Sequence, residues 1–173
     1  RTFQQIKLAN SLTVLENVMV PLSVMAASNE RIEARAIAWL DRLKIRQFAD
    51  LRPNEMAYGD QRRVEIARAL ALSPTFLLLD EPAAGMNHEE TDGLRLLLTE
   101  IRDELGIGII VVEHDLSLIM NMCDKIIVLN RGSLIATGTP KEIQSNPDVI
   151  EAYIGLEEDQ SQKTKAAFRG IGN

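Results

Sequence analysis

The sequence is poor in cysteine: of its 173 residues only Cys123 is one, which excludes an internal disulfide and a zinc site built from cysteines. It also lacks any apolar run near the ~20 residues that a membrane-spanning helix needs, which predicts a soluble protein.

There is no excess of basic residues, because the chain has 19 Lys and Arg and 25 Asp and Glu. A general nucleic-acid-binding protein needs a basic face, so nucleic acid is not an expected partner. The single cysteine fits a reducing environment, so a cytoplasmic setting is expected.

The first part of the chain carries helical patterns only. Apolar residues recur at helical spacing over 11–28, where Pro21 is expected to kink or end the helix, and again from Asn29 onward. A third helix is expected over 61–72, with Arg62 and Glu65 among the charged residues between its apolar positions. We therefore expect a helical subdomain over residues 11–72, preceded by a short stretch over residues 1–10.

From residue 73 onward the pattern changes to short apolar strands that alternate with amphipathic helices. Apolar runs predict strands at 75–79, 107–112 and 125–129, and the first two are expected to be buried within a parallel sheet. The order strand, helix, strand, helix, strand predicts an α/β sheet with right-handed crossovers over residues 73–156. The polar stretch that follows predicts a disordered tail over residues 157–173.

Two acidic residues, Asp80 and Glu81, follow the first of these strands. In an open α/β sheet, ligands bind at the carboxyl ends of the strands. An aspartate there can hold Mg²⁺ through oxygen, and a neighbouring glutamate can orient or deprotonate a water molecule. The same pair is equally compatible with a strand that ends in a solvated acidic turn, so the strand pattern alone leaves both interpretations open.

Three weaker features accompany this pair in the sequence. Gly59 lies next to the start of the 61–72 helix, where backbone N–H groups and the positive end of the helix dipole could approach a phosphate. His114 follows the next strand along the chain, and Gln4 lies near the N-terminus. Each has an ordinary explanation by itself, because glycine is common at helix starts, a single histidine is usually structural or exposed, and glutamine is a common surface residue.

Taken in this order and spacing, the motifs resemble those of the ATP-binding cassette (ABC) ATPases over most of the chain, up to about residue 156. The wording of residues 56–63, 81–87 and 146–155 is similar to that of the ATPase subunit of branched-chain amino-acid importers. The correspondence is Gln4 with the Q-loop glutamine, Ala57, Tyr58, Gly59 and Asp60 with the signature loop, Asp80 and Glu81 with the Walker B motif, Ala84–Asn87 with the D-loop, and His114 with the switch histidine.

The resemblance implies an α/β fold, namely an ABC-type ATPase (P-loop NTPase-like) core sheet with a helical subdomain. It implies an ATPase that uses ATP and Mg²⁺, in which Asp80 and Gln4 bind the metal, Glu81 activates water and His114 contacts the γ-phosphate. Two such subunits would sandwich two ATP molecules, with the signature loop and Asn87 facing the partner's nucleotide. Transmembrane permease subunits would hold the protein at the inner face of the plasma membrane, a substrate-binding protein would act indirectly, and branched-chain amino acids are the expected solutes.

The sequence departs from the usual family pattern in several places. Ala57 stands where the signature loop usually has a serine hydroxyl, Tyr58 and Asp60 replace the usual glycine and glutamine, and Asn87 replaces the aspartate of the D-loop. The largest departure is that no G-x-x-x-x-G-K-[ST] phosphate-binding loop occurs in the 173 residues. We interpret the chain as a fragment that begins at the Q-loop, with the N-terminal part of the core absent, and expect this fragment alone to be inactive.

The motifs leave two alternative functions open. A soluble ABC ATPase of DNA repair or translation would share these motifs, although no coiled-coil insertion lies between Gln4 and Gly59. A non-catalytic cassette fragment that acts as an interaction module would dock on a partner without turning over ATP. Nucleotide binding by the chain distinguishes such a module from an enzyme.

Overall fold

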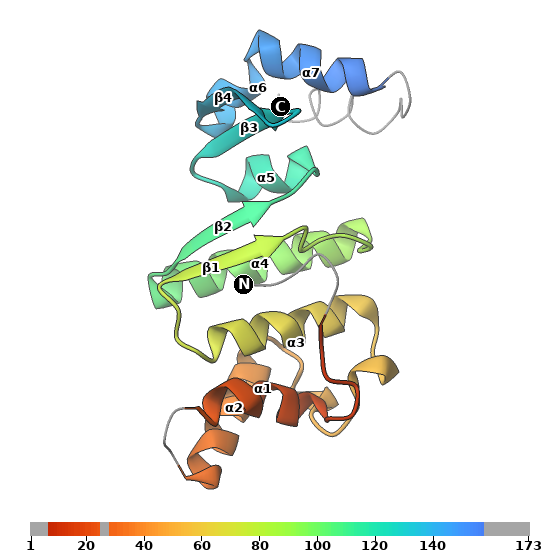
Figure 1. Ribbon diagram of the computed structural model, residues 1–173, viewed down its shortest axis with the longest axis vertical. Helices are drawn as coiled ribbons and strands as arrows, with labels where there is room; N and C mark the ends of the chain where they lie inside the picture. Colours follow the sequence, from red (N-terminus) through yellow and green to blue (C-terminus); the bar gives the residue numbers. More distant parts are fainter. Residues whose placement is uncertain (1–6, 25–27, 158–173) are drawn as a thin grey trace. The chain divides into compact units, whose positions relative to one another are not determined.

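The computed structural model describes residues 7–24 and 28–157 of the chain, with side chains described through residue 152 (Figure 1). Its contacts divide the chain into two compact units, Arg1–Val112 and Glu113–Asn173. Within the described ranges, no helix is both long and apolar enough to cross a membrane. The domain bounds expected from the sequence, at residues 10, 72 and 156, stay a prediction, and the polar tail beyond residue 157 lies outside the described residues.

The first unit begins with three helices, α1 (Val14–Leu22), α2 (Asn29–Arg42) and α3 (Tyr58–Leu70). Thr13 starts α1 with a capping box, since its side chain accepts a hydrogen bond from the Glu16 backbone and the Glu16 carboxylate accepts one from Thr13. Pro21 lies in the last turn and ends α1 instead of kinking it. The third helix begins three residues earlier than predicted, and two short 3₁₀ helices, Arg46–Phe48 and Pro53–Glu55, connect α2 to it.

Buried polar side chains hold this helical part together in a way the sequence did not reveal. Asn17 is 1% exposed, and its side chain bonds the backbone of Ala9 in both directions, at 2.9 Å and 3.0 Å. Arg62 and Glu65, two of the charged residues between the apolar positions of α3, are buried, and their side chains form an ion pair of 2.6 Å. Two opposite charges at i and i+3 can enter a helix interface together, so the charge pattern of α3 by itself did not reveal the burial of this pair.

A parallel strand–helix–strand unit follows, formed by β1 (Phe76–Asp80), α4 (His88–Leu105) and β2 (Gly108–Val112). The strands pair in parallel from Phe76 opposite Gly108 to Asp80 opposite Val112. Gly106 ends α4 at φ +62°, a left-handed conformation that glycine adopts without steric cost. This unit confirms the predicted crossover and places the end of β1 beside the end of β2.

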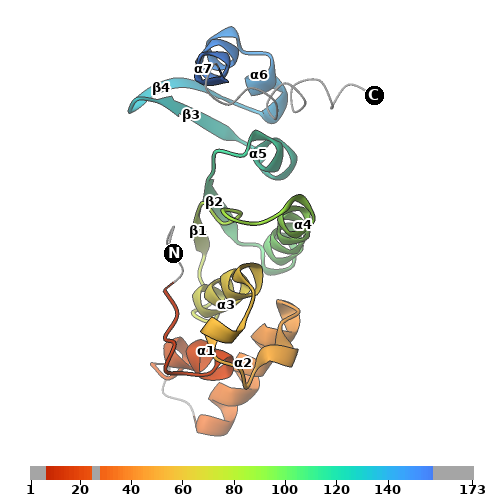
Figure 2. The same cartoon turned by 90° about the vertical axis from the view of Figure 1, so that its right-hand side faces the viewer.

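The two strands are not buried on both faces, contrary to the expectation from their apolar runs. Leu77 and Leu79 are buried, whereas Phe76, Leu78 and Ile110 on the opposite face are 59%, 41% and 52% exposed. Figure 2 shows the reason, because α4 runs along one face of the β1–β2 pair. Among the described residues of this unit, no element packs against the other face in the same way.

The second unit contains α5 (Leu116–Met122), β3 (Ile126–Asn130), β4 (Ser133–Gly138), α6 (Pro140–Gln144) and α7 (Pro147–Glu157). The predicted hairpin is confirmed, because β3 and β4 pair antiparallel through a turn in which Arg131 and Gly132 both have positive φ. These strands form a sheet of their own, separate from β1 and β2. The single parallel sheet expected through the third strand is therefore replaced, in the described residues, by two sheets of two strands.

Candidate functional site

Asp80 and Glu81 lie at the carboxyl end of β1, as the sequence predicted. Asp80 is the last residue of the strand and pairs in register with Val112, the last residue of β2. The backbone N–H of Glu81 donates a hydrogen bond of 2.8 Å to the Val112 carbonyl, so the strand pairing extends one residue further. Both acidic side chains therefore start from backbone that the neighbouring strand holds in place.

The backbone at Glu81 leaves the strand in an unusual conformation. Its φ of +43° lies in the left-handed region, which costs a residue with a side chain about 1–3 kcal/mol. The turn that follows is closed by backbone hydrogen bonds from Ala84 to Glu81 and from Met86 to Ala83, of 3.2 Å and 3.0 Å. A strained backbone at a functional carboxylate is typical of sites where the surrounding structure fixes the direction of a side chain.

The D-loop residue Asn87 starts helix α4. Its side-chain oxygen accepts a hydrogen bond of 3.0 Å from the Glu90 backbone, and the Glu90 carboxylate accepts one of 2.9 Å from the Asn87 backbone. This capping box, expected from the Asn87–Glu90 spacing, is confirmed. Asn87 therefore has a structural role in α4 beside any role toward a ligand.

The signature-loop residues form the first turn of α3. Ala57 is the N-cap residue, and its methyl side chain makes no capping hydrogen bond. Tyr58 and Gly59 follow as the first helical residues, where backbone N–H groups lack an acceptor one turn earlier in the helix, whereas the Asp60 N–H donates a hydrogen bond of 3.1 Å to the Ala57 carbonyl. This end of α3 carries the positive part of the helix dipole, which favours an anion.

The fold brings the signature loop and the D-loop together within the first unit. A Cβ built on Gly59 would lie 3.5 Å from Oε1 of Glu90 and 3.9 Å from Cε of Met86. A Cβ built on Gly85 would lie 3.6 Å from Cε1 of Tyr58. Two motifs that the sequence separates by a helix and a strand are thus neighbours in space.

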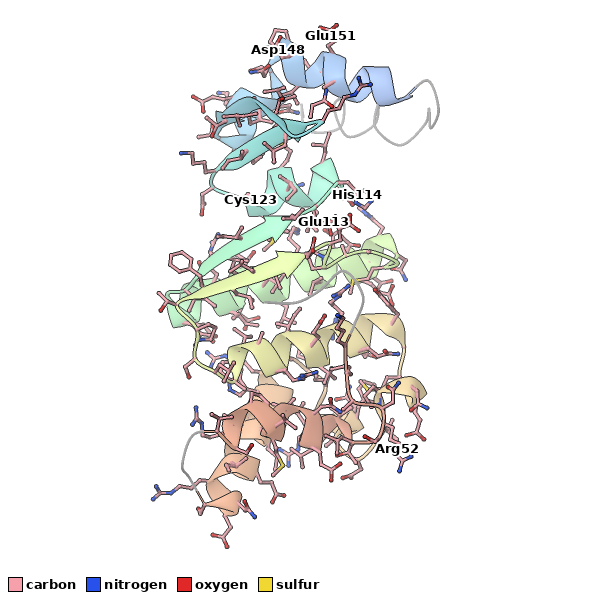
Figure 3. All side chains as sticks on the ribbon, in the orientation of Figure 1. Arg52, Glu113, His114, Cys123, Asp148 and Glu151 are labelled. Atoms are coloured by element: carbon pink, nitrogen blue, oxygen red, sulfur yellow. The ribbon has the colours of Figure 1, made fainter. Side chains whose placement is uncertain are left out.

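His114 follows β2 by two residues in the chain and belongs to the second unit, which begins at Glu113 (Figure 3). Its side chain is 76% exposed, whereas the adjacent Glu113 side chain is only 1% exposed. One Glu113 carboxylate oxygen accepts a hydrogen bond of 3.1 Å from the His114 backbone and lies 3.7 Å from Nδ1 of the ring. On the other side, Asp115 caps α5 by accepting hydrogen bonds from the Ser117 and Leu118 backbones. The imidazole of His114 is therefore exposed to solvent, while hydrogen bonds of Glu113 and Asp115 fix the backbone on either side of it.

Gln4, the predicted Q-loop residue, lies outside the described residues. The segment that follows it is anchored within the first unit, because Nη1 of Arg68 donates a hydrogen bond of 2.6 Å to the Lys7 carbonyl. Sequence reasoning missed Glu113 as a neighbour of His114 and Arg62 as a partner of Tyr58. The i, i+4 spacing of Tyr58 and Arg62 was the available signal for the second contact.

The acidic pair suits a magnesium ion. Mg²⁺ is usually bound by one or two carboxylates together with waters and substrate phosphates, and Asp80 supplies such a carboxylate at the strand end. Over residues 7–24 and 28–157, no cluster of three or more His, Cys, Asp or Glu side chains could enclose a metal by itself. A cation here would therefore depend on the phosphates of a nucleotide for much of its coordination.

Comparison with known families shows which protein family the chain resembles. A family model described as "ABC transporter" matches residues 1–84, and one described as "Branched-chain amino acid ATP-binding cassette transporter" matches residues 133–159. The high-affinity branched-chain amino acid transport ATP-binding protein LivG of Salmonella typhimurium is 42% identical over 170 residues, which cover 90% of this chain and 67% of LivG. The corresponding protein BraF of Pseudomonas aeruginosa is 39% identical over 170 residues.

Solved structures agree with this placement. The ABC transporter cassette MJ1267 in its ADP conformation matches 90% of this chain and 67% of its own, with a TM-score of 0.76 and 29% identity. A dimeric post-hydrolysis state of the cassette MJ0796, bound to ADP and Pi, matches 80% of this chain and 61% of its own, with a TM-score of 0.72 and 34% identity.

The chain belongs to the ABC transporter ATP-binding family. Within that family, its relatives at 39–42% identity are high-affinity branched-chain amino acid transport ATP-binding proteins. The predicted resemblance, the α/β ABC-ATPase fold class and the functional class of an importer ATPase are confirmed at this level.

Proposed function

We propose that the protein is the ATP-hydrolysing subunit of an ABC importer for branched-chain amino acids. The observation that supports ATPase activity is the Asp80–Glu81 pair, held at the carboxyl end of β1 by the Glu81–Val112 hydrogen bond. The identity of 42% to LivG supports the solute class. Because selectivity for the solute resides in other subunits, the solute rests on this similarity alone.

Each site residue has a proposed role in phosphoryl transfer, which depends mostly on positioning and charge neutralisation. Asp80 and Gln4 would bind Mg²⁺, which supplies positive charge beside the phosphates. Glu81 would accept a hydrogen bond from the attacking water and orient it toward the γ-phosphate. His114, with its exposed ring, would contact the γ-phosphate.

The signature loop supports a dimeric arrangement, as in the solved dimer of MJ0796. The first turn of α3 offers backbone N–H groups and a positive helix end, which suit the γ-phosphate of a nucleotide bound to a second cassette. Asn87 lies beside this turn and would contact the second cassette. Permease subunits would hold the pair at the inner face of the plasma membrane, and a substrate-binding protein would act through them.

The test compares Glu81→Gln with wild type in the full-length subunit, assembled with its permease. The amide keeps the shape of the side chain and loses the base, so ATP binding is expected to persist while steady-state hydrolysis falls about 10²–10⁴-fold. Glu89→Gln, the same chemical change at an exposed position of α4, is the matched control and is expected to hydrolyse ATP like wild type.

A second measurement in the same preparation tests the solute. Leucine, isoleucine and valine, each presented with the binding protein, are expected to stimulate hydrolysis, whereas methionine is not. Hydrolysis by Glu81→Gln at the wild-type rate would remove Glu81 from its role. Stimulation by methionine alone would overturn the solute while leaving the ATPase intact.

A further inference from the structure

The signature-loop residue Tyr58 is held from inside its own helix. Its hydroxyl oxygen accepts a hydrogen bond of 3.2 Å from Nη2 of Arg62, one turn later in α3. The Arg62 guanidinium carbon lies 5.8 Å from the centre of the Tyr58 ring, within the range of a cation–π interaction. Arg62 is 0% exposed and forms a 2.6 Å ion pair with Glu65, so the group that holds Tyr58 is itself fixed by its surroundings.

The ring of Tyr58 also contacts the turn that carries the D-loop. It covers the side of Gly85 from which a side chain would project, with Cε1 and Cδ1 at 3.6 Å and 3.7 Å from the position of a Cβ. Gly85 has a φ of +77°, so glycine allows the turn to adopt this conformation beside the ring. Asn87 follows two residues later as the N-cap of α4.

A second contact joins the same two segments. The open side of Gly59 faces the Glu90 carboxylate, at 3.5 Å from where a Cβ would lie. That carboxylate accepts the backbone hydrogen bond of Asn87, so the cap of α4 lies against the first turn of α3. Movement of the D-loop away from the signature loop would have to break both contacts.

We propose that Tyr58 is a positioning residue, which fixes the distance between the signature loop and Asn87 so that both meet the partner cassette as one rigid surface. The proposal rests on the proposed function, because both segments are taken to face a second cassette. Tyrosine suits this role, since its rigid ring has two torsions to restrain and buries a large contact area. The residue is 40% exposed, so part of the ring also lies at the surface.

The test compares Tyr58→Ala and Tyr58→Phe in the assembled transporter. Tyr58→Ala removes the ring from Gly85, and kcat for ATP hydrolysis is expected to fall roughly ten- to a hundredfold because small misplacements of reacting groups have effects of this size. The KM for ATP is expected to change by less than about twofold, since the proposed arrangement places Tyr58 toward the partner cassette and away from the nucleotide of its own subunit. Tyr58→Phe keeps the ring contact and is expected to retain at least about a third of the wild-type kcat.

The control is Leu72→Ala, an exposed apolar residue two positions after α3, which is expected to behave like wild type. If Tyr58→Ala does not fold, Tyr58→Leu keeps much of the apolar volume without the planar ring, and is expected to lose kcat with KM preserved. Equal kcat for wild type, Tyr58→Ala and Tyr58→Leu would overturn the inference, as would a loss confined to KM.

The failure of this inference can be told apart from failure of the proposed function. If the wild-type assembly hydrolyses ATP and Glu81→Gln does not, the ATPase assignment holds, whatever Tyr58→Ala does. If wild type does not hydrolyse ATP, the proposed function fails first, and the role of Tyr58 fails with it.

Discussion

The backbone N–H of Glu81 donates a hydrogen bond of 2.8 Å to the carbonyl oxygen of Val112, the last residue of the neighbouring strand. Glu81 itself lies outside β1 and has a φ of +43°. The neighbouring strand thus holds the proposed catalytic residue at the point where its backbone turns into the left-handed region. The left-handed backbone at Glu81 lowers the local stability, and the surrounding structure keeps it because it fixes the position of the carboxylate.

The strain at Glu81 can be measured by unfolding. Glu81→Gly is expected to be more stable than Glu81→Ala by about 1 kcal/mol, because both lose the carboxylate and only glycine is free of the left-handed penalty. Urea unfolding of the two variants gives the difference. Glu100 on the exposed side of α4 is the control, since there alanine is expected to be more stable than glycine by about 1 kcal/mol. The same order at both positions would contradict a strained Glu81.

The two histidines of the chain form a matched pair for testing His114. In the assembled transporter, His114→Ala is expected to lower ATP hydrolysis about 10²–10⁴-fold, because the ring would contact the γ-phosphate or the attacking water. Its thermal stability is expected to change little, since the ring is 76% exposed. His88→Ala, at the start of α4 with a side chain 87% exposed, is expected to leave both quantities unchanged. A large loss of stability in His114→Ala would instead indicate a structural histidine.

The 173-residue chain by itself is expected not to bind ATP measurably below about millimolar concentration. It contains no G-x-x-x-x-G-K-[ST] loop, whose backbone N–H groups and lysine supply the main contacts to the β- and γ-phosphates. Asp80 and Glu81 would repel the triphosphate without that compensation. Calorimetric titration with ATP and Mg²⁺ makes the test, with the whole LivG subunit as the positive control. Micromolar binding by the chain would contradict this expectation.

The helix α6 is expected to respond to acid through Glu142. Hydrogen bonds from the backbone N–H of Thr139 and then from its hydroxyl, at 2.8 Å and 2.9 Å, lower the pKa of Glu142. A lowered folded-state pKa means that the capping contribution is present above the ordinary carboxyl pKa and is lost as pH falls through the folded value. Removing the hydroxyl with Thr139→Ala should raise the pKa of Glu142 toward its ordinary value.

An NMR titration of the Glu142 side-chain carboxyl carbon measures this pKa in both proteins. Ser145→Ala is the control, because the Ser145 hydroxyl donates to the backbone carbonyls of Lys141 and Glu142 and not to the carboxylate. An unchanged pKa in Thr139→Ala would assign the whole effect to the backbone hydrogen bond.

Features that depend on residues close together in the chain were predictable. The capping boxes at Asn87 and Thr139 each need two residues three positions apart, and Gly106 ends α4 by its own freedom to adopt a positive φ. Asp80 and Glu81 could be placed at a strand end because the apolar run stops before them. The family followed from the order of short motifs, each of which is a local feature.

Contacts between residues that are far apart in the chain were decided by tertiary packing. The burial of Arg62 depends on an interface and an ion pair, and helical periodicity records neither. Apolar strands 76–80 and 108–112 look alike on both faces in the sequence, and only the position of α4 determines which face is covered. The contact of Tyr58 with Gly85 and the bond from Glu81 to Val112 join residues from different elements, so their energies exist only once those elements have docked.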